Sequence, residues 1–266
     1  MAKQCDEIDY RLIGEEMQAV VVTLDPDEQV IAEAGAMLYM TEGIDMQTSM
    51  AANKGTGFLG SLARAAGRML TGESFFVTTF TNTGRQRADV AFSAPYPGKI
   101  VPLDMQKHGG EMICQKDAFL CAARGTDLTI AFQKKFGAGL FGGEGFILQR
   151  LRGDGLAFVH AGGSVFPMDL AEGQSLRLHA GCLVAFEPTV NYDIQFVGGF
   201  KNALFGGDGL FFAVMRGPGR CYLQTLPFSR LADRIVSASK LGGGSRRDEG
   251  SLLGGLGGLV LGDSDS

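Results

Sequence analysis

Three acidic residues that each follow a glycine are the side chains in this sequence whose repetition could support chemistry. They are Glu73, Glu144 and Asp208. Three carboxylates brought onto one axis could bind a cation or hold a raised pKa. Alternatively, each carboxylate accepts backbone N–H bonds at the start of a hairpin, as short acidic side chains beside glycine often do. The repetition favours this second interpretation, because a structural need that recurs produces the same residue each time.

The histidines form no recognisable catalytic or metal-binding pattern. His108, His160 and His179 are far apart along the chain, and none lies in an H-x-H or H-E-x-x-H motif. A cupin-type metal site would need clustered His and Glu ligands. The sequence also contains no G-x-S-x-G elbow and no G-x-x-x-x-G-K-S/T loop. We therefore expect no enzymatic activity, no metal site and no cofactor.

The composition is typical of a folded soluble protein and narrows the classes of partner. The chain has 266 residues, 45% of them hydrophobic, and a formal net charge of −5, so a nucleic-acid partner is not expected. Its five cysteines include no C-x-x-C pair, which favours a reducing compartment without disulfides or zinc. The polar N-terminus lacks a signal-peptide core, and we expect a cytoplasmic protein.

An internal repeat predicts the architecture. A shift of 64 residues places Phe136 on Phe200 and Gly155 on Gly219, with similar sequence around both pairs. An earlier copy is visible before them. Units of this size cannot bury their apolar faces alone, so they should share one core. The repeat units are expected at residues 17–104, 109–170 and 173–228.

Each repeat carries the same order of strand and turn signals. A short apolar segment precedes one that alternates apolar and polar residues, as in Leu128, Ile130 and Phe132. A glycine-rich connector then leads to a predicted hairpin with strong turn residues. These turns are expected at residues 82–84, 152–155 and 216–219.

These signals predict an all-β fold with one or two short helices. A further hairpin is expected from Met17 to Val30, turning at residues 25–27. Frequent turns favour a β-sandwich or barrel, here with the three repeats in a pseudo-threefold arrangement. The β-rich domain should span residues 1–235, and residues 236–266 should form a flexible tail rich in Gly and Ser.

Helical spacing appears twice outside the repeat pattern. Residues 57–70 place Phe58 and Leu62 on one side and Arg64 and Arg68 on the other. Such a helix could lie on a membrane surface or contact a partner, or it could cap the open end of a barrel. Because it carries only two basic residues, we favour the cap. A second helix is predicted over residues 229–236.

The spacing of glycine, acidic and aromatic residues carries a family resemblance. The stretches 68–76, 143–155 and 207–219 resemble the altered inheritance of mitochondria protein family, and the likeness covers about residues 10–230. The resemblance implies a repeat-built β fold similar to the tryptophan RNA-binding attenuation protein, in a family of unknown function that includes conserved bacterial members. Its mitochondrial members are linked to inner-membrane organisation. RNA binding does not transfer with the fold.

Together these observations favour a non-catalytic structural or assembly protein that is peripheral to the membrane. We expect a homo-oligomer, because the sheet edges of such a fold must be covered, and a membrane surface or protein complex as a further partner. Two alternatives remain open. One is a small-ligand or RNA-binding module that uses the grooves between repeats, and the other is a metal-dependent cupin-like enzyme.

Overall fold

The computed structural model describes most of the chain as two units. Residues up to Ser229 form one unit and the residues from Arg230 form the other, and each is considered by itself. The described residues are 4–33, 35–50, 76–134, 146–197 and 210–242.

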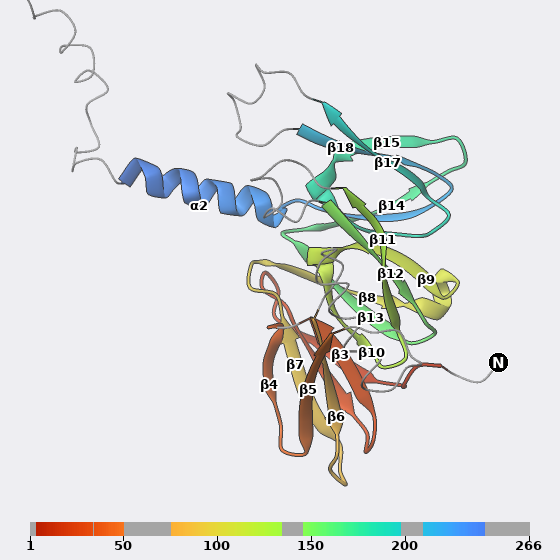
Figure 1. The fold of residues 1–266 in the computed structure, drawn as a ribbon, viewed down its shortest axis with the longest axis vertical. Helices are drawn as coiled ribbons and strands as arrows, with labels where there is room; N and C mark the ends of the chain where they lie inside the picture. Colours follow the sequence, from red (N-terminus) through yellow and green to blue (C-terminus); the bar gives the residue numbers. More distant parts are fainter. Residues whose placement is uncertain (1–3, 34, 51–75, 135–145, 198–209, 243–266) are drawn as a thin grey trace, which may run out of the picture. The chain divides into compact units, whose positions relative to one another are not determined.

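The first unit consists of β-sheets, as the sequence predicts (Figure 1). Sheet A has the strand order β1-β2-β7-β4, and sheet B has the order β5-β6-β3-β10-β13-β8. The strands of sheet A are β1 (Asp9–Ile13), β2 (Ala19–Leu24), β7 (Ala88–Ser93) and β4 (Met37–Met40). Those of sheet B are β5 (Ile44–Met50), β6 (Phe76–Asn82), β3 (Gln29–Glu33), β10 (Phe119–Ala123), β13 (Leu156–Gly162) and β8 (Gly98–Asp104).

Two further sheets contain the second half of this unit. Sheet C has the order β11-β12-β9-β16-β19-β14, and sheet D has the order β15-β18-β17. The strands of sheet C are β11 (Asp127–Lys134), β12 (Phe146–Arg152), β9 (Glu111–Gln115), β16 (Leu183–Phe186), β19 (Gly219–Gln224) and β14 (Val165–Leu170). Those of sheet D are β15 (Ser175–His179), β18 (Leu210–Arg216) and β17 (Asn191–Val197).

Three short 3₁₀-helices lie between strands in the part of the chain that the structure describes. They are η1 (Met105–His108), η2 (Lys116–Ala118) and η4 (Ala180–Cys182). The helices η2 and η4 occupy corresponding places: η2 lies between β9 of sheet C and β10 of sheet B, and η4 lies between β15 of sheet D and β16 of sheet C. Each of the two therefore marks a corner at which the chain leaves one sheet for another.

Sheets B and C have the same internal order. Replacing each strand of sheet B by the strand one repeat later reproduces the order of sheet C. The strands β4, β10 and β16 also share a register irregularity against their neighbours β7, β13 and β19. Each six-stranded sheet therefore combines three strands from one part of the chain with three strands from the part that follows.

The predicted turns are present, but they do not join hairpins. The turn after Asn82 connects β6 of sheet B to β7 of sheet A, and the turns at 152–155 and 216–219 also pass between sheets. The turn at 25–27 likewise joins β2 of sheet A to β3 of sheet B, so the predicted hairpin from Met17 to Val30 is wrong. Turn residues specify a reversal of direction, whereas the hydrogen-bonding partner of a strand is chosen by non-local packing.

Sequence-adjacent antiparallel pairing instead occurs across the glycine-rich connectors. Strands β5 and β6, β11 and β12, and β17 and β18 pair with each other. The described sheets are open, each with two edge strands, so the barrel alternative is wrong and stacked sheets replace it.

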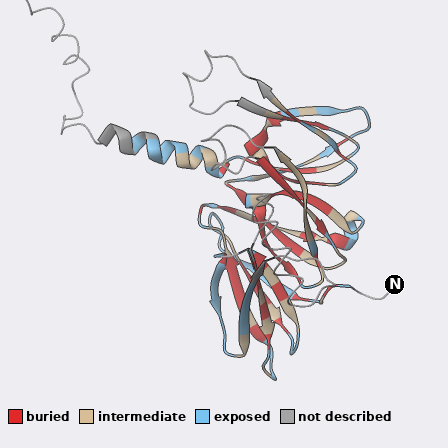
Figure 2. Ribbon diagram, viewed as in Figure 1, coloured by how far each residue is buried: buried red, intermediate tan, exposed pale blue. Residues whose placement is uncertain are grey.

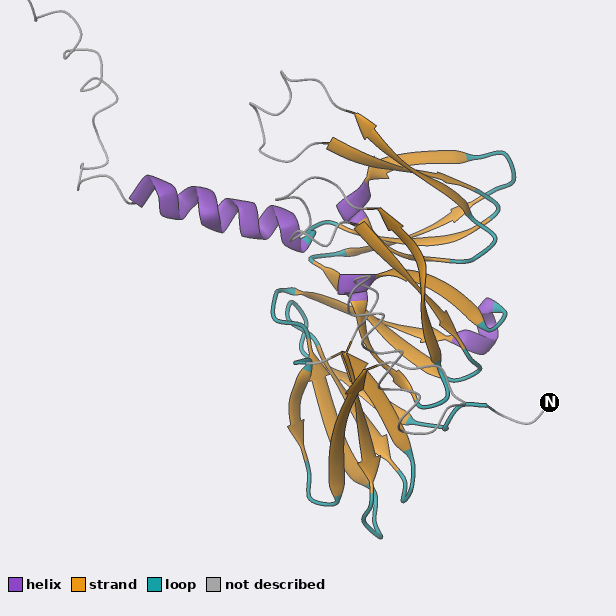
Figure 3. Ribbon diagram, viewed as in Figure 1, coloured by secondary structure: helices purple, strands orange, loops and turns teal. Residues whose placement is uncertain are grey.

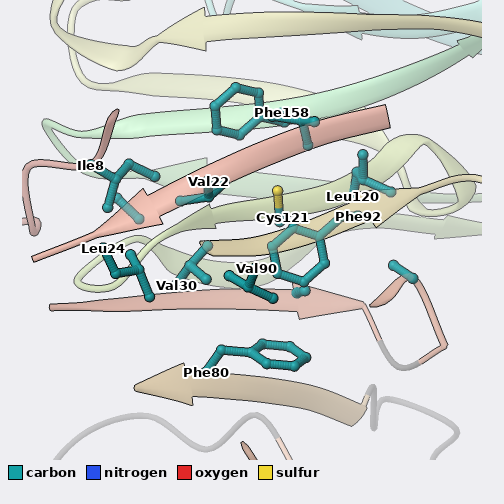
Figure 4. Packing of buried hydrophobic residues seen from close by; sticks show 14 of the residues in the cluster. Ile8, Val22, Leu24, Val30, Phe80, Val90, Phe92, Leu120, Cys121 and Phe158 are labelled. Atoms are coloured by element: carbon teal, nitrogen blue, oxygen red, sulfur yellow. The ribbon is translucent and has the colours of Figure 1, made fainter. Parts of the chain in front are cut away.

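Three apolar layers hold the sheets together (Figure 2). The first lies between sheets A and B, where the rings of Phe80 and Phe92 meet edge to face at 5.2 Å between centroids (Figure 4). The second lies between sheets B and C, and the third between sheets C and D. In β9, Met112 and Cys114 face the second layer whereas Ile113 faces the third. Successive side chains of a strand point to opposite faces of its sheet, and here both sets are buried, so β9 contributes to the layers on both faces of sheet C.

The helix α2 (Phe228–Gly242) is longer than the helix predicted over 229–236. It continues past residue 235, at which the predicted β-rich domain ends. Figure 3 shows it as the one long helix among the described residues. The β-strand content of the first unit and the presence of this helix agree with the predicted fold class.

Candidate functional site

The residues singled out by sequence lie outside the described part of the chain. This applies to the three repeated acids and to the four marked residues of the 57–70 helix. They are Glu73, Glu144, Asp208, Phe58, Leu62, Arg64 and Arg68. Their proposed roles stay predictions, and the candidate site described below consists of other residues.

A hollow of about 490 Å³ lies beside the pairing of β14 with β19. Its walls come from η1, from the end of β14, from the start of β19 and from the residue that follows β16. The lining residues are Lys107, His108, Asp169, Leu170, Glu187, Gly219 and Arg220. The hollow therefore collects charged groups from four places along the chain.

The imidazole of His108 is held by the carboxylate of Glu187. Nδ1 of His108 lies 2.9 Å from Oε1 of Glu187. The other oxygen, Oε2, accepts the backbone N–H of Arg220 at 2.9 Å. His108 is in place because η1 is capped at both ends: the carboxylate of Asp104, before the helix, accepts the N–H of Gln106, and Gly109, after it, lies in the left-handed region. Such caps fix the ends of a short helix and so orient its last side chain.

The guanidinium of Arg220 forms the second pair in the hollow. It donates to both oxygens of Asp169, at 2.6 and 2.8 Å, in the two-pronged geometry that suits a carboxylate. The two residues face each other across the pairing of β14 with β19. Hydrogen bonds from Arg220 hold the pKa of Asp169 below its usual range, and the same contact raises the pKa of Arg220.

Gly219 gives the hollow its shape. Its φ is +140°, a conformation that side chains rarely adopt. A Cβ atom at this position would lie 2.5 Å from Oγ1 of Thr189 and 2.7 Å from Cγ2 of Val190. Any larger residue would therefore disturb the start of β19 and with it the position of Arg220.

The arrangement can hold charge, but its charges already have partners. The contact between Nδ1 of His108 and Glu187 has the geometry of a His–carboxylate pair. None of the lining residues is Ser, Thr or Cys, so the described lining offers no usual nucleophile for such a pair. Lys107 is paired with Asp104 at 3.0 Å. An anionic ligand would have to displace a carboxylate already bonded to Arg220 or compete with Asp104 for Lys107.

Sequence reasoning missed this hollow, although the repeat contained a signal for it. The 64-residue shift places Glu187 on Ala123, Arg220 on Leu156 and His108 on Glu172. Charged or titratable residues that break a repeat pattern are candidates for a role that the other copies lack. Glu73, Glu144 and Asp208 have the opposite property, since every copy of the repeat carries one of them.

The other two histidines lie elsewhere, within strands. His160 lies in β13 and is buried, with the ring of Tyr96 edge-on at 4.6 Å between centroids. Burial lowers the pKa of His160 to about 4. His179 ends β15. Among the residues that the structure describes, no group of three or more His, Cys, Asp or Glu side chains is arranged to hold a metal ion.

None of the five cysteines forms a disulfide, and four of them are buried. Among the helices of the described ranges, none combines the length and the apolar composition that crossing a bilayer requires.

Comparison with known proteins identifies a family for this chain and a solved structure with a similar fold. Residues 10–226 match the family described as mitochondrial biogenesis AIM24. The chain is 29% identical over 240 residues to an uncharacterized protein of Streptococcus pyogenes serotype M6, covering 88% of this chain and 93% of that relative. It is also similar to the crystal structure of a Streptococcus pyogenes protein, with a TM-score of 0.69 and 21% identity, covering 87% of this chain and all of the other. This last likeness concerns the fold alone.

Proposed function

This chain belongs to the mitochondrial biogenesis AIM24 family, and from that premise we propose that it is a non-catalytic structural protein that assembles with other proteins. The proposal includes self-association and a location on the cytoplasmic side of a membrane, to which the protein is peripheral. It also includes the finer fold assignment, three repeats in a pseudo-threefold arrangement similar to the tryptophan RNA-binding attenuation protein.

One observation carries this proposal: exposed apolar side chains concentrate on the two edges of sheet A. Thirteen large hydrophobic residues are exposed in the described part of the chain, and seven of them lie on β1 or β4. All residues of both strands are exposed (Figure 2). Grouped apolar residues on a surface mark contact sites, whereas single ones are ordinary. Sheet A is therefore the surface we assign to protein contacts.

The membrane part of the proposal rests on sequence. The amphipathic segment at 57–70 and the tail at 236–266 are the two stretches that the repeat does not account for. A helix with one apolar face can bind a bilayer surface weakly and reversibly. A tail rich in glycine could reach a partner at some distance from the β-sheets.

The test is co-purification of the native protein from its host, with and without detergent, followed by variants on β1. Ile13 is 50% exposed, and Ile13→Lys should weaken capture of a specific partner without unfolding the chain. Phe166, 56% exposed on β14, provides the matched control Phe166→Lys, which should leave capture unchanged. Equal losses in both variants, or no specific partner in any preparation, would contradict the assembly role.

Membrane attachment is tested separately by sedimentation with anionic liposomes. The intact chain should sediment with the vesicles, and chains lacking 57–70 or 242–266 should do so less. If the intact chain stays in the supernatant at low salt, where attraction to anionic lipid is strongest, the membrane part of the proposal is wrong and the assembly role is unaffected.

A second candidate function is binding of a small anionic ligand in the hollow. This function is favoured by Lys107, His108 and Arg220, which all line the same hollow. A thermal shift with phosphate or a dicarboxylate that disappears in Arg220→Leu would support it. Leucine is the residue that the preceding repeat carries at this position, Leu156. No shift at millimolar ligand would reject it.

A further inference from the structure

The two end sheets look like the separated halves of the sheets between them. Sheets B and C each join a trio of strands to a second trio, β5-β6-β3 to β10-β13-β8 and β11-β12-β9 to β16-β19-β14. Sheet D is β17-β18-β15, which corresponds to a first trio alone. Sheet A contains β4-β7-β2, which corresponds to a second trio alone, with β1 added at its far side.

The strands that join the trios within the chain have unpaired counterparts at its ends. The junctions are β3 with β10 and β9 with β16. The strand equivalent to β10 in the preceding repeat is β4, and the strand equivalent to β9 in the following repeat is β15. Among the described strands, β4 pairs with β7 and β15 pairs with β18, so each has one edge without a partner strand. These are the two edges at which the internal pattern stops.

Burial differs sharply between β4 and the strands it corresponds to. Every residue of β10 and of β16 is buried. Every residue of β4 is exposed, although its sequence, Met-Leu-Tyr-Met, is as apolar as theirs. An exposed edge with four apolar residues and no Lys or Pro is what monomeric proteins avoid, because it can pair with another strand. The composition of β4 therefore fits a strand that is covered.

The internal junctions also specify a register. Cys121 faces Ala32 in one junction and Ala185 faces Cys114 in the other, and these two pairs are equivalent by the repeat. Aligning β4 with β10 at the register irregularity that they share makes Tyr39 equivalent to Cys121 and Met40 equivalent to Ala122. Transferring the pairing to the chain ends gives Tyr39 opposite Leu178, Met40 opposite Arg177 and Thr41 opposite Leu176.

We propose that β15 of one copy of this chain pairs antiparallel with β4 of a second copy, in this register. Sheet D of the first copy and sheet A of the second then form one sheet in the order β17-β18-β15-β4-β7-β2-β1. The inference rests on the proposed assembly role and names the chain itself as a partner. Because the two surfaces in contact are different, the contact is head-to-tail, and repeating it gives a ring or a filament.

The other open edges do not support the same inference. Strands β1, β5, β8, β11, β14 and β17 also lie at the edges of the described sheets. However, no junction between repeats uses these strands, so the chain provides no example of how they would be paired or in which register. Pairing of β15 with β4 of a second copy would repeat the contact that the chain already makes twice, between β3 and β10 and between β9 and β16.

Disulfide trapping between two different variants tests both the pairing and its register. Met40→Cys is placed in one preparation and Arg177→Cys in another, each with Cys182→Ser, which removes the cysteine that is not fully buried. Both substituted residues are exposed. Directly opposite residues have Cα atoms about 4.5–5.5 Å apart, within the range of a disulfide. Mixing the two should give a crosslinked pair under mild oxidation.

Two controls limit the interpretation of the crosslink. Met40→Cys mixed with Ser175→Cys, two residues out of register, should react at least about tenfold more slowly, since diagonal neighbours lie about 7–8 Å apart. Each variant alone should remain uncrosslinked, because head-to-tail pairing never brings two β4 strands together. Crosslinking of Met40→Cys with itself, or equal rates for both mixtures, would overturn the proposal.

Sedimentation of the unmodified full-length chain gives an independent measurement. Association should rise with concentration, and Met40→Lys should weaken it about tenfold or more. Met46→Lys is the matched control, since Met46 is 45% exposed and lies on the edge strand β5. A chain that stays monomeric at all concentrations, with no crosslink in the mixture, refutes the pairing. Partner capture that depends on Ile13 could still persist, so that outcome leaves the assembly role standing.

Discussion

His160 should make the stability of this protein fall on mild acidification. The residue lies in β13 and is only 2% exposed. The ring of Tyr96 packs edge-on against it, and the backbone of Gly98 approaches so closely that a Cβ there would lie 2.5 Å from Nε2. Among the described residues, nothing forms a hydrogen bond with its Nδ1. A positive charge on this ring would therefore be poorly solvated.

The size of the effect follows from the difference between the two pKa values. Burial lowers the pKa of His160 to about 4 in the folded chain, from 6.5 in the unfolded chain. At pH 7 the ring is largely neutral in both the folded and the unfolded chain, so protonation of His160 does not yet favour unfolding. Below pH 6.5 the unfolded state binds the proton first, and stability falls as the pH decreases towards 4. The full loss is about 3 kcal/mol, and about 2 kcal/mol of it should occur by pH 5, at about 1.4 kcal/mol for each pH unit.

Urea unfolding at pH 7 and pH 5 measures this loss, and His160→Gln isolates it. Other groups titrate in the same range, so the informative quantity is the difference between the two proteins. The variant should be less stable at pH 7, because a well-packed ring is lost, but should lose about 2 kcal/mol less on going to pH 5. His179→Gln is the control, since His179 is only partly buried. Equal pH dependence in the chain and in His160→Gln, or a His160 titration midpoint near 6.5 by NMR, would refute the reasoning.

The remaining predictions concern packing, backbone conformation and access. Phe158→Ala should lower the free energy of unfolding by about 3–5 kcal/mol in urea titrations, because Phe158 is fully buried between sheets A and B. Gly219→Ala should lower the Tm and also abolish any ligand-induced thermal shift, because positive φ and close contacts oppose a methyl group. Asp154→Ala should speed proteolysis near the N-terminus, since its carboxylate accepts two backbone N–H groups there at 2.9 and 2.8 Å. Ellman's reagent at pH 8 should label Cys182 quickly and Cys114 only on unfolding, because burial raises the pKa of the Cys114 thiol to about 12; fast reaction of several thiols would contradict this.

Local sequence determined the strands and turns of this protein. Alternation at Leu128, Ile130 and Phe132 predicted β11, and the turn residues at 82–84 predicted a reversal of the chain after β6. At that turn Asn82 is fully buried, and its side chain bonds Leu24 O, Gln86 O and Gly84 N. Periodicity and turn chemistry act over a few residues, so a sequence displays them directly.

The tertiary structure decided which strands pair and which residues meet. The turn after β6 leads to another sheet rather than to a hairpin, and β4 is exposed although its counterpart β10 is buried. His108 meets Glu187 across 79 positions of sequence, a contact that depends on the way consecutive repeats share one sheet. The repeat pattern alone could not specify that sharing, because a strand has two edges and two faces. The packing of the apolar layers determines which strand lies at each edge and which side chains lie against each face.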